Sequence, residues 1–467
     1  MRALRHAVAA SGVALLLSGC AAFRSYDAEL YPALEQASSG NVDGAIRLLE
    51  SNNRLPDKDL LYFMELGMLQ RLGSRYDESQ KAWMAAEARI EASGSDGFAE
   101  LASLASNASS FVLNDKMRVY QGHDYERVML LTYMALNHLA RGDYDNARIA
   151  IKQTHEFEAQ VAELRAKQYA QVEDEARKRG ARTSVRELNG YPVETIDNPA
   201  VNALRNSYQS ALSHYLAGFV YEALGEPSLA APGYRLANEL QPDHALLEEG
   251  LRGLDARVAA PDDGMTEVLF IIGTGTAPAL QSRQFALPMF VQGRFILLPH
   301  SFPVITTTSA PSWPRRVVVE GSALAVEPIT SVDAMARRRL KDDMPSIMLR
   351  ATIRTTTAAV LQYQTQRIGD RQSLATALAA AAVTVGSAAL ASADDRTWRA
   401  LPSDIYIARG RLPRGPHTVT LETSDGPRRA SIDVAGRYAV VDFRLLRQQV
   451  FVNAPRAQGA SGGGQRP

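Results

Sequence analysis

The sequence predicts an α+β multidomain protein, in which an N-terminal all-α solenoid of helix pairs precedes a β-rich domain containing a helical pair. Three observations predict this arrangement. A helical pattern recurs with a period of 34 residues, extended periodicity begins after Gly264, and helical patterning returns at about 331–393. With 467 residues, 46% of them hydrophobic, the chain is long enough for about three globular domains.

Charge and cysteine content narrow the function classes. The chain carries 51 basic and 51 acidic residues, whereas nucleic-acid-binding proteins need a concentrated basic surface, so we expect no nucleic-acid partner. A single cysteine excludes an intramolecular disulfide and a multi-cysteine metal site. Neither a phosphate-binding Gly-x-x-x-x-Gly-Lys loop nor a His-Glu-x-x-His motif occurs. We therefore predict no metal, no cofactor, no catalytic residue and no enzymatic activity.

The first residues have the pattern of an export signal. Arg2 and Arg5 precede an uncharged run from Ala7 to Leu17, which is too short to span a bilayer as a helix. Leu17-Ser18-Gly19-Cys20 then resembles the lipobox of bacterial lipoproteins. That resemblance implies a signal peptide over 1–19, cleavage before Cys20, and acylation of Cys20 by palmitate-type chains. Ala21 in place of aspartate resembles an outer-membrane address, so we expect a lipid-anchored protein that faces the periplasm.

The helical repeats come next, over 20–260. The clearest unit is 211–244, where small residues mark a close helix crossing and Gly225 can end the first helix in the left-handed conformation. Its pattern resembles a tetratricopeptide repeat, with Gly218, Tyr221, Gly225, Ala230, Tyr234, Ala237 and Pro242 at the expected offsets. The same template fits 26–59, 60–93 and 128–161, whose starts are 34 and 68 residues apart, and 94–127 is read as a distorted unit.

The resemblance to tetratricopeptide proteins implies a concave groove lined by the first helix of each unit. On that basis we expect five residues to line a partner-binding groove: Met68, Arg71, Tyr215, Phe219 and Glu222. The expected partners are proteins of the cell envelope.

A charged helical insertion is predicted at about 156–200. Four acidic residues precede a basic residue by four positions, the favourable order on a helix. Because its apolar stripe is thin, we expect a long solvated helix that projects from the array. The four pairs are Glu163 and Lys167, Glu173 and Arg177, Asp174 and Lys178, and Glu175 and Arg179.

Residues 264–453 are predicted to form the β-rich domain. Strands are expected at 268–272, 295–298 and 317–319, and a meander is expected over 405–443 with turns at Gly415, Gly426 and Gly436. Between them lie helices at about 331–393. The stretch 374–391 has no charge but is mostly alanine, so we expect a buried helix paired with 346–368 rather than a membrane span. The tail 454–467 is rich in Gly, Ser and Pro and is expected to be disordered.

The chain as a whole resembles a family of Gram-negative outer-membrane lipoproteins, which combines a lipobox and tetratricopeptide repeats with later motifs. Those motifs are matched by Gly275-Thr276-Ala277-Pro278, Trp398-Arg399-Ala400-Leu401-Pro402 and the run from Leu412 to His417, and Tyr120–Glu126 and Tyr215–Gly225 also look like family blocks. The resemblance implies a periplasmic protein-interaction scaffold in cell-envelope assembly or maintenance. Two alternatives stay open: a cell-wall-active enzyme with its site in the C-terminal half, and a membrane-perturbing component that uses 374–391.

Overall fold

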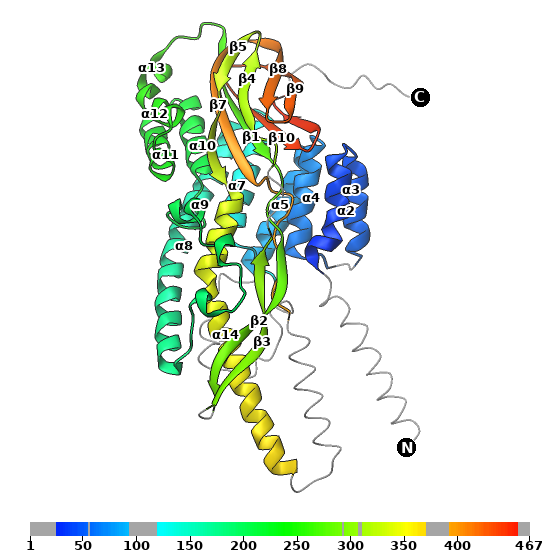
Figure 1. Cartoon of the computed structure of the whole chain (residues 1–467). Coiled ribbons are helices and arrows are strands. Elements are labelled where there is room, and N and C mark those ends of the chain that lie inside the picture. The colour runs from blue at the N-terminus through cyan, green and yellow to red at the C-terminus, as the bar shows by residue number, and fades with distance from the viewer. Residues whose placement is uncertain are drawn as a thin grey trace.

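The computed structural model describes residues 25–54, 57–92, 119–291, 294–306, 311–369 and 392–455, with the backbone alone described for 287–291, 294–299 and 354–369. The predicted signal peptide over 1–19, Cys20, most of the segment 94–127, the stretch 374–391 and the tail from 456 lie outside these residues. The described chain is an α+β protein with its helical part in the N-terminal half and its sheets in the C-terminal half (Figure 1).

Antiparallel helix pairs build the N-terminal half. The second helices of the first three pairs begin at residues 42, 76 and 144, which are 34 and 68 residues apart, as the repeat pattern requires. The second helix of the fourth pair begins at Pro227, 83 residues after the third, so the insertion breaks the period. The third pair begins at Asp124, four residues before the start at 128 that the pattern predicts. The pairs are α2 (Tyr26–Ser38) with α3 (Val42–Asn52), α4 (Leu60–Leu72) with α5 (Tyr76–Ala92), α7 (Asp124–Leu139) with α8 (Tyr144–Arg179), and α10 (Ala211–Ala223) with α11 (Pro227–Leu240). Two shorter helices follow, α12 (Ala245–Arg252) and α13 (Leu254–Ala259).

Local signals set the helix ends. The side chains of Asn41, Asp59 and Asp143 accept hydrogen bonds from main-chain N–H groups at the starts of α3, α4 and α8. Gly142 and Gly225 take a φ of +74° in the turns after α7 and α10, a conformation that favours glycine. These residues therefore define helix ends and turns through local interactions, independently of the packing between helix pairs.

The charged insertion is part of the array rather than separate from it. It continues α8 as one 36-residue helix, followed by the short helices η3 (Val185–Glu187), η4 (Val193–Thr195) and α9 (Pro199–Ala203). All four predicted ion pairs form on α8. The helix is not solvated on every side, because Val172 and Ala176 pack against Leu349 and Ile353 of α14 (Val332–Gly369). Its thin apolar stripe is therefore the contact with a second long helix, and the two project together (Figure 1).

The strands form two packed sheets and a separate ribbon. One sheet has the order β11-β10-β1-β7-β6, the other β5-β4-β8-β9, and β2 pairs with β3. The strands are β1 (Met265–Thr274), β2 (Leu280–Val291), β3 (Arg294–Ile305), β4 (Pro314–Val319), β5 (Ser322–Ala325), β6 (Glu327–Ser331), β7 (Asp404–Pro413), β8 (Gly415–Thr423), β9 (Gly426–Val434), β10 (Tyr438–Leu446) and β11 (Gln449–Asn453).

The predicted meander over 405–443 is wrong in one respect. Its strands and its turns at Gly415, Gly426 and Gly436 are present, but only β8 and β9 are neighbours in a sheet. The chain passes from one sheet to the other after β7 and returns after β9, and β10 lies parallel to β1. The passages between sheets produce a sandwich in place of a single meander.

Strand β1 joins the two halves of the chain into one body. Its run 268–272 is apolar at every position because both faces are covered. Val268, Phe270 and Ile272 point into the core between the two sheets. Leu269 and Ile271 belong to the core that the five-stranded sheet shares with the helix pairs. The parts predicted as 20–260 and 264–453 therefore pack on a common core.

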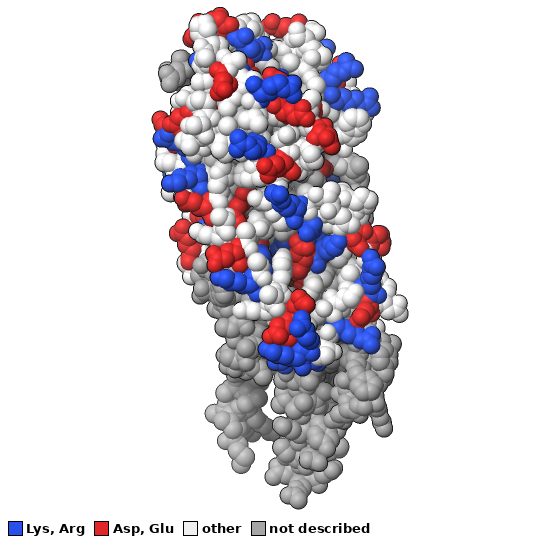
Figure 2. Space-filling view, turned by 90° about the vertical axis from the view of Figure 1, so that its left-hand side faces the viewer, with Lys and Arg blue, Asp and Glu red and all other residues white. Residues whose placement is uncertain are grey.

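The surface reflects the balanced charge of the chain. Figure 2 shows basic and acidic side chains interspersed over the face that it presents, on the helical part and on the sandwich alike. Opposite charges on the surface of the described residues are often paired, for example Arg411 with Asp263 and Arg414 with Asp262.

Candidate functional site

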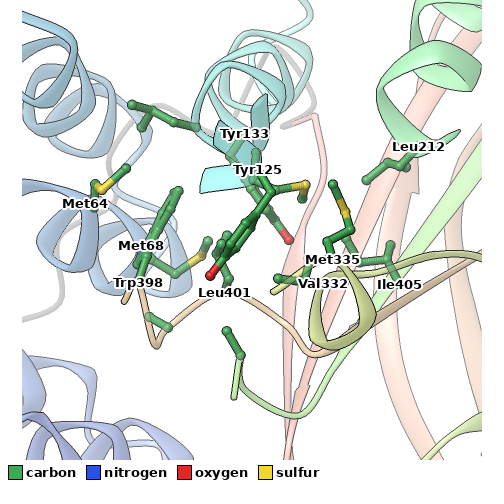
Figure 3. Close-up of a cluster of buried hydrophobic side chains, with 14 of the residues drawn as sticks. Met64, Met68, Tyr125, Tyr133, Leu212, Val332, Met335, Trp398, Leu401 and Ile405 are labelled. Carbon is green, nitrogen blue, oxygen red and sulfur yellow. The ribbon is translucent and has the colours of Figure 1, made fainter. Parts of the chain in front are cut away.

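The segment 392–403, here called the central segment, fills the space between the helix pairs and the sandwich. It has no helix or strand and links the region after α14 to β7. Its middle is completely enclosed, with Thr397 1% exposed and Trp398 and Leu401 0%. Figure 3 shows Trp398 and Leu401 among side chains from α4, α7 and α14. The segment thus lies across first helices of the array, where the sequence predicts a groove.

Two buried glutamates hold the main chain of the central segment. Glu65 of α4 accepts hydrogen bonds from the N–H groups of Arg399 and Ala400, at 2.7 and 3.0 Å. Glu126 of α7 accepts from the N–H of Trp398 at 2.7 Å and from the Thr397 hydroxyl at 3.0 Å. Three consecutive N–H groups therefore donate to carboxyl oxygens in an interior where such bonds are strong.

Burial and hydrogen bonding act on the two carboxyl groups in opposite directions. Burial raises the pKa of Glu65 to about 8, although the N–H groups of Arg399 and Ala400 lower it. Burial also raises the pKa of Glu126, against hydrogen bonds from Tyr120 and from main-chain N–H groups. Both oxygens of Glu65 accept main-chain N–H groups, and these hydrogen bonds favour the ionised form, against the effect of burial.

Trp398 anchors the central segment in an aromatic pocket. Its ring meets Trp83 edge-on with centroids 6.1 Å apart, and Trp83 also lies 6.0 Å from Tyr133. Trp83 packs so closely on α4 that a Cβ added at Gly67 would lie 2.2 Å from its Nε1 atom. Glycine at 67 is therefore required for the helix crossing that builds one wall of the pocket.

The five predicted groove residues lie in the interior of the chain. Their side chains are buried, with exposures of 2% for Met68, 1% for Arg71, 0% for Tyr215, 0% for Phe219 and 1% for Glu222. The expectation that they line an open partner groove is therefore corrected. They do lie on first helices of the pairs, but that face is covered by the C-terminal half of the same chain.

Charged pairs explain why this face is closed. Arg71 of α4 forms a buried ion pair with Asp442 of β10 at 2.9 Å. Glu222 of α10 pairs with Arg409 of β7 at 2.6 Å and with Arg257 at 2.7 Å. Burial opposes ionisation of Glu222, but the hydrogen bonds from the two arginines outweigh it and hold its pKa below the usual value. A charged group on each helix thus finds its partner on a strand of the five-stranded sheet.

Neither Glu65 nor Glu126 was predicted as a functional residue from the sequence, although the sequence around Glu65 contains a signal. Glu65 stands alone among apolar residues from Leu60 to Leu69, apart from the tyrosine at 62. A lone carboxylate on a helix that is apolar on all sides requires a buried partner. Glu126 lies beside Asp124 near a helix start, where acidic residues are ordinary, and it gives no comparable signal.

The central segment contains one of the motifs that carry the family resemblance, the run from Trp398 to Pro402, and the run from Gly275 to Pro278 packs against it. The N–H of Ala277 donates to the carbonyl of Leu401 at 2.7 Å. Gly275 has a φ of +65°, and a Cβ there would lie 2.6 Å from the hydroxyl oxygen of Ser403. His417 contacts the carbonyl of Pro413 and the carboxyl group of Glu320, both at 2.7 Å, and so braces its own turn. In this fold these motif residues hold the central segment and a strand turn in place.

A cavity of about 270 Å³ lies beside the central segment, between α7, α8, α14 and the base of the ribbon. Its apolar wall includes Phe157, Val161 and Leu340. Its charged wall carries four arginines and three aspartates: Arg127, Arg165, Arg339, Arg350, Asp124, Asp343 and Asp394. Arg165 pairs with Asp124 at 2.6 Å and with Asp343 at 3.8 Å, and Arg339 pairs with Asp343 at 2.8 Å. The cavity thus combines an apolar wall with a charged wall, a mixed lining that suits an amphiphilic molecule.

The described residues contain neither a candidate metal site nor a helix that could span a membrane. No cluster of three or more His, Cys, Asp or Glu side chains there could hold a metal ion. None of the helices in that part of the chain combines the length and apolar character needed to cross a membrane. Comparisons with known protein families, with curated protein sequences and with solved structures found no match to this chain.

Proposed function

We propose that this chain is an outer-membrane lipoprotein that faces the periplasm and acts as a protein-interaction scaffold in cell-envelope assembly or maintenance. The anchor rests on the lipobox-like run Leu17-Ser18-Gly19-Cys20 behind a short apolar stretch. Acylation at Cys20 by more than one chain gives stable attachment, whereas one chain gives only marginal binding. The membrane is thus one partner, reached through lipid, and envelope proteins are the others.

The helical half is proposed to be a tetratricopeptide-like solenoid. The spacing of the second helices, 34 and 68 residues, supports this because that period is typical of such repeats. Close crossings at the expected small residues also support it: a Cβ at Gly218 would lie 2.7 Å from the ring of Tyr234, as at Gly67 and Trp83. Both crossings match the positions at which these repeats need small residues.

The observation that carries the scaffold proposal is how the helices hold the central segment. Glu65 and Glu126 bind main-chain N–H groups, and the Trp398 ring fills a pocket. Binding an extended segment through its main chain and one aromatic anchor is how interaction modules hold peptides. Here the bound peptide belongs to the same chain, so other proteins must use the outer surface of the array.

Exposed apolar side chains on the second helices mark that outer surface. Met84 of α5 is 57% exposed, Ile149 of α8 55% and Leu229 of α11 51%. Each lies on the second helix of a pair, away from the first helices that contact the central segment. Exposed apolar residues in this position supply contact area for a protein partner.

Site-specific photocrosslinking in intact cells tests the scaffold. A photoreactive phenylalanine analogue at Met84, Ile149 or Leu229 is expected to give discrete, reproducible adducts with envelope proteins. The same analogue at Ser322, an exposed residue of the sandwich, serves as the control position. Adducts that arise equally from Ser322, or none from the three helix positions, would contradict the proposal.

The anchor has a separate test. Radioactive palmitate should label the wild-type protein and not Cys20→Ser, and the variant should accumulate at precursor size. Labelling that persists in the variant would overturn the assignment of Cys20.

A further inference from the structure

In the described part of the chain, the β2–β3 ribbon joins no other named strand, and an isolated β-bridge links Ala286 of β2 to Asn189. Its base is fixed, because Phe302, Val304 and Ile305 are buried in the main core and the Tyr191 hydroxyl donates to the carbonyl of Pro303. Beyond the base it extends away from the body beside α14 (Figure 1). An isolated two-stranded ribbon is marginal in water, so its outer half requires another source of stability.

The sequence of that outer half is apolar on both faces. The register places Leu287 opposite Leu298, Met289 opposite Ile296 and Phe290 opposite Phe295. Because side chains alternate along a strand, the first two pairs share one face and the third lies on the other. A ribbon with one solvated face would alternate with polar residues, and this one does not. Arg294, beside the turn, is the sole charged residue of 285–299.

The start of the array lies beside the base of this ribbon. The Tyr26 N–H donates to Asp395 at 3.3 Å, and two residues away the Ala393 N–H donates to the Ser282 hydroxyl at 2.9 Å. From Tyr26 back to Cys20 the chain can extend by at most about 20 Å. From Ser282 to Val291, β2 extends by about 30 Å. The ribbon is therefore longer than the tether to the proposed anchor.

We propose that the outer half of the ribbon, residues 287–291 and 294–298, inserts into the surface of the membrane that holds the acyl chains of Cys20. This inference rests on the proposed lipid anchor. If the tether brings the membrane within about 20 Å of Tyr26, the longer ribbon overlaps the bilayer by about 10 Å. Insertion is shallow, because the outer edges of a two-stranded ribbon carry unpaired N–H and C=O groups that hydrocarbon cannot satisfy.

A fluorescence experiment tests the insertion without acylation. The mature chain from residue 20 with Cys20→Ser contains no cysteine. An N-terminal hexahistidine tag and nickel-chelating lipids replace the acyl chains and hold the protein at vesicles of phosphatidylethanolamine and phosphatidylglycerol. Met289→Cys carries an environment-sensitive dye, and Ser322→Cys on the sandwich is the matched control.

The dye at 289 is expected to brighten several-fold, shift to the blue and be quenched by nitroxides on lipids, whereas the dye at 322 stays unchanged. Adding Leu297→Asp should abolish the response at 289 while circular dichroism stays native. No response at 289 overturns the proposal. So does a dye that is already shielded without vesicles, which would mean that a second copy or the chain's own 370–391 covers the ribbon. Palmitate labelling reads the anchor independently, so failure of the anchor and failure of insertion are distinguishable.

Discussion

The central segment and the β2–β3 ribbon both lie outside the helices, and their main-chain groups and apolar side chains are accommodated in opposite ways. The central segment is enclosed, and its N–H groups find the carboxyl groups of Glu65 and Glu126. The ribbon leaves the body, and its two faces are apolar along 287–298. The comparison teaches that a segment outside the helices is stable in this protein where helices supply hydrogen-bond acceptors and apolar contacts. Where they do not, those contacts must come from outside the described chain. Three substitutions and one change of pH test how the buried side of this comparison is held, and they follow in order of decreasing effect on stability.

The largest effect is expected for Trp398→Ala. The ring is fully buried between the array and the sandwich, so its removal leaves a large cavity and should lower the free energy of unfolding by about 4 kcal/mol. Trp313→Ala is the control, because Trp313 is 45% exposed and its loss should cost little. Urea denaturation of both variants measures the difference. Equal losses would show that the central segment is not held as described.

A smaller loss is expected for Glu65→Gln. The amide places an NH₂ group where the carboxylate accepts an N–H, so one buried donor loses its partner at a cost of about 2–3 kcal/mol. Glu78→Gln, at an exposed position of α5, should leave stability unchanged. An unaltered Glu65→Gln protein would mean that the Glu65 carboxyl is already protonated, as the rise of its pKa by burial would favour.

Acid should weaken the contact between α8 and α10 through His155. Its ring stacks on His214 with centroids 4.7 Å apart, and Glu158 lies 2.8 Å from His214. Burial lowers the pKa of His155 to about 4, so between pH 6.5 and 4 the unfolded chain takes up a proton that the native chain does not. Stability should therefore fall by about 2 kcal/mol as the pH falls through this range.

His155→Phe keeps the stacked ring and removes the proton site. Comparing its thermal unfolding with that of wild type between pH 4 and pH 7 isolates the His155 contribution, because all other titrating groups are common to both. Parallel pH profiles would rule out a role for His155.

The smallest effect is expected for Arg177→Ala on the projecting part of α8. Its pair with Glu173 has both side chains more than 70% exposed, so water replaces the interaction at no measurable cost. The same substitution at Arg71 should destabilise strongly, because it leaves the Asp442 carboxylate buried and unpaired. Calorimetry on the two variants gives the contrast, and similar melting temperatures would refute it.

Local sequence signals predicted part of the elements. The helix pairs that begin at 26 and 60, the ion pairs of α8 and the strands at 268–272, 295–298, 317–319 and within 405–443 follow from spacing and alternation, which depend on neighbours in sequence. The strands β2, β5, β6 and β11 were not predicted. The start of α7 was misplaced by four residues because its added turn, Asp124–Arg127, lies outside the 34-residue template. The pairing of the strands could not be predicted from the sequence in the same way, because β10 lies beside β1 and the two strands are far apart in the chain.

The candidate site was also predicted only in part from the sequence. Sequence identified the Trp398 motif and the first helices as notable, but it placed Met68, Arg71, Tyr215, Phe219 and Glu222 in a groove open to partners. Periodicity shows which face of a helix is apolar and not what covers that face. Only the three-dimensional packing decided that the chain itself covers it, through Arg71 with Asp442 and Glu222 with Arg409.

By itself the sequence determined the helix period of the first three pairs, some of the strand positions, the exposed ion pairs and the lipobox-like run, because each depends on residues close to one another in the chain. The tertiary structure alone decided that a segment near residue 400 enters the helical array and that the ribbon stays outside. Those outcomes depend on which distant donors meet which buried acceptors, and carboxylates such as Glu65 gain their role only when main-chain N–H groups from far along the chain arrive beside them.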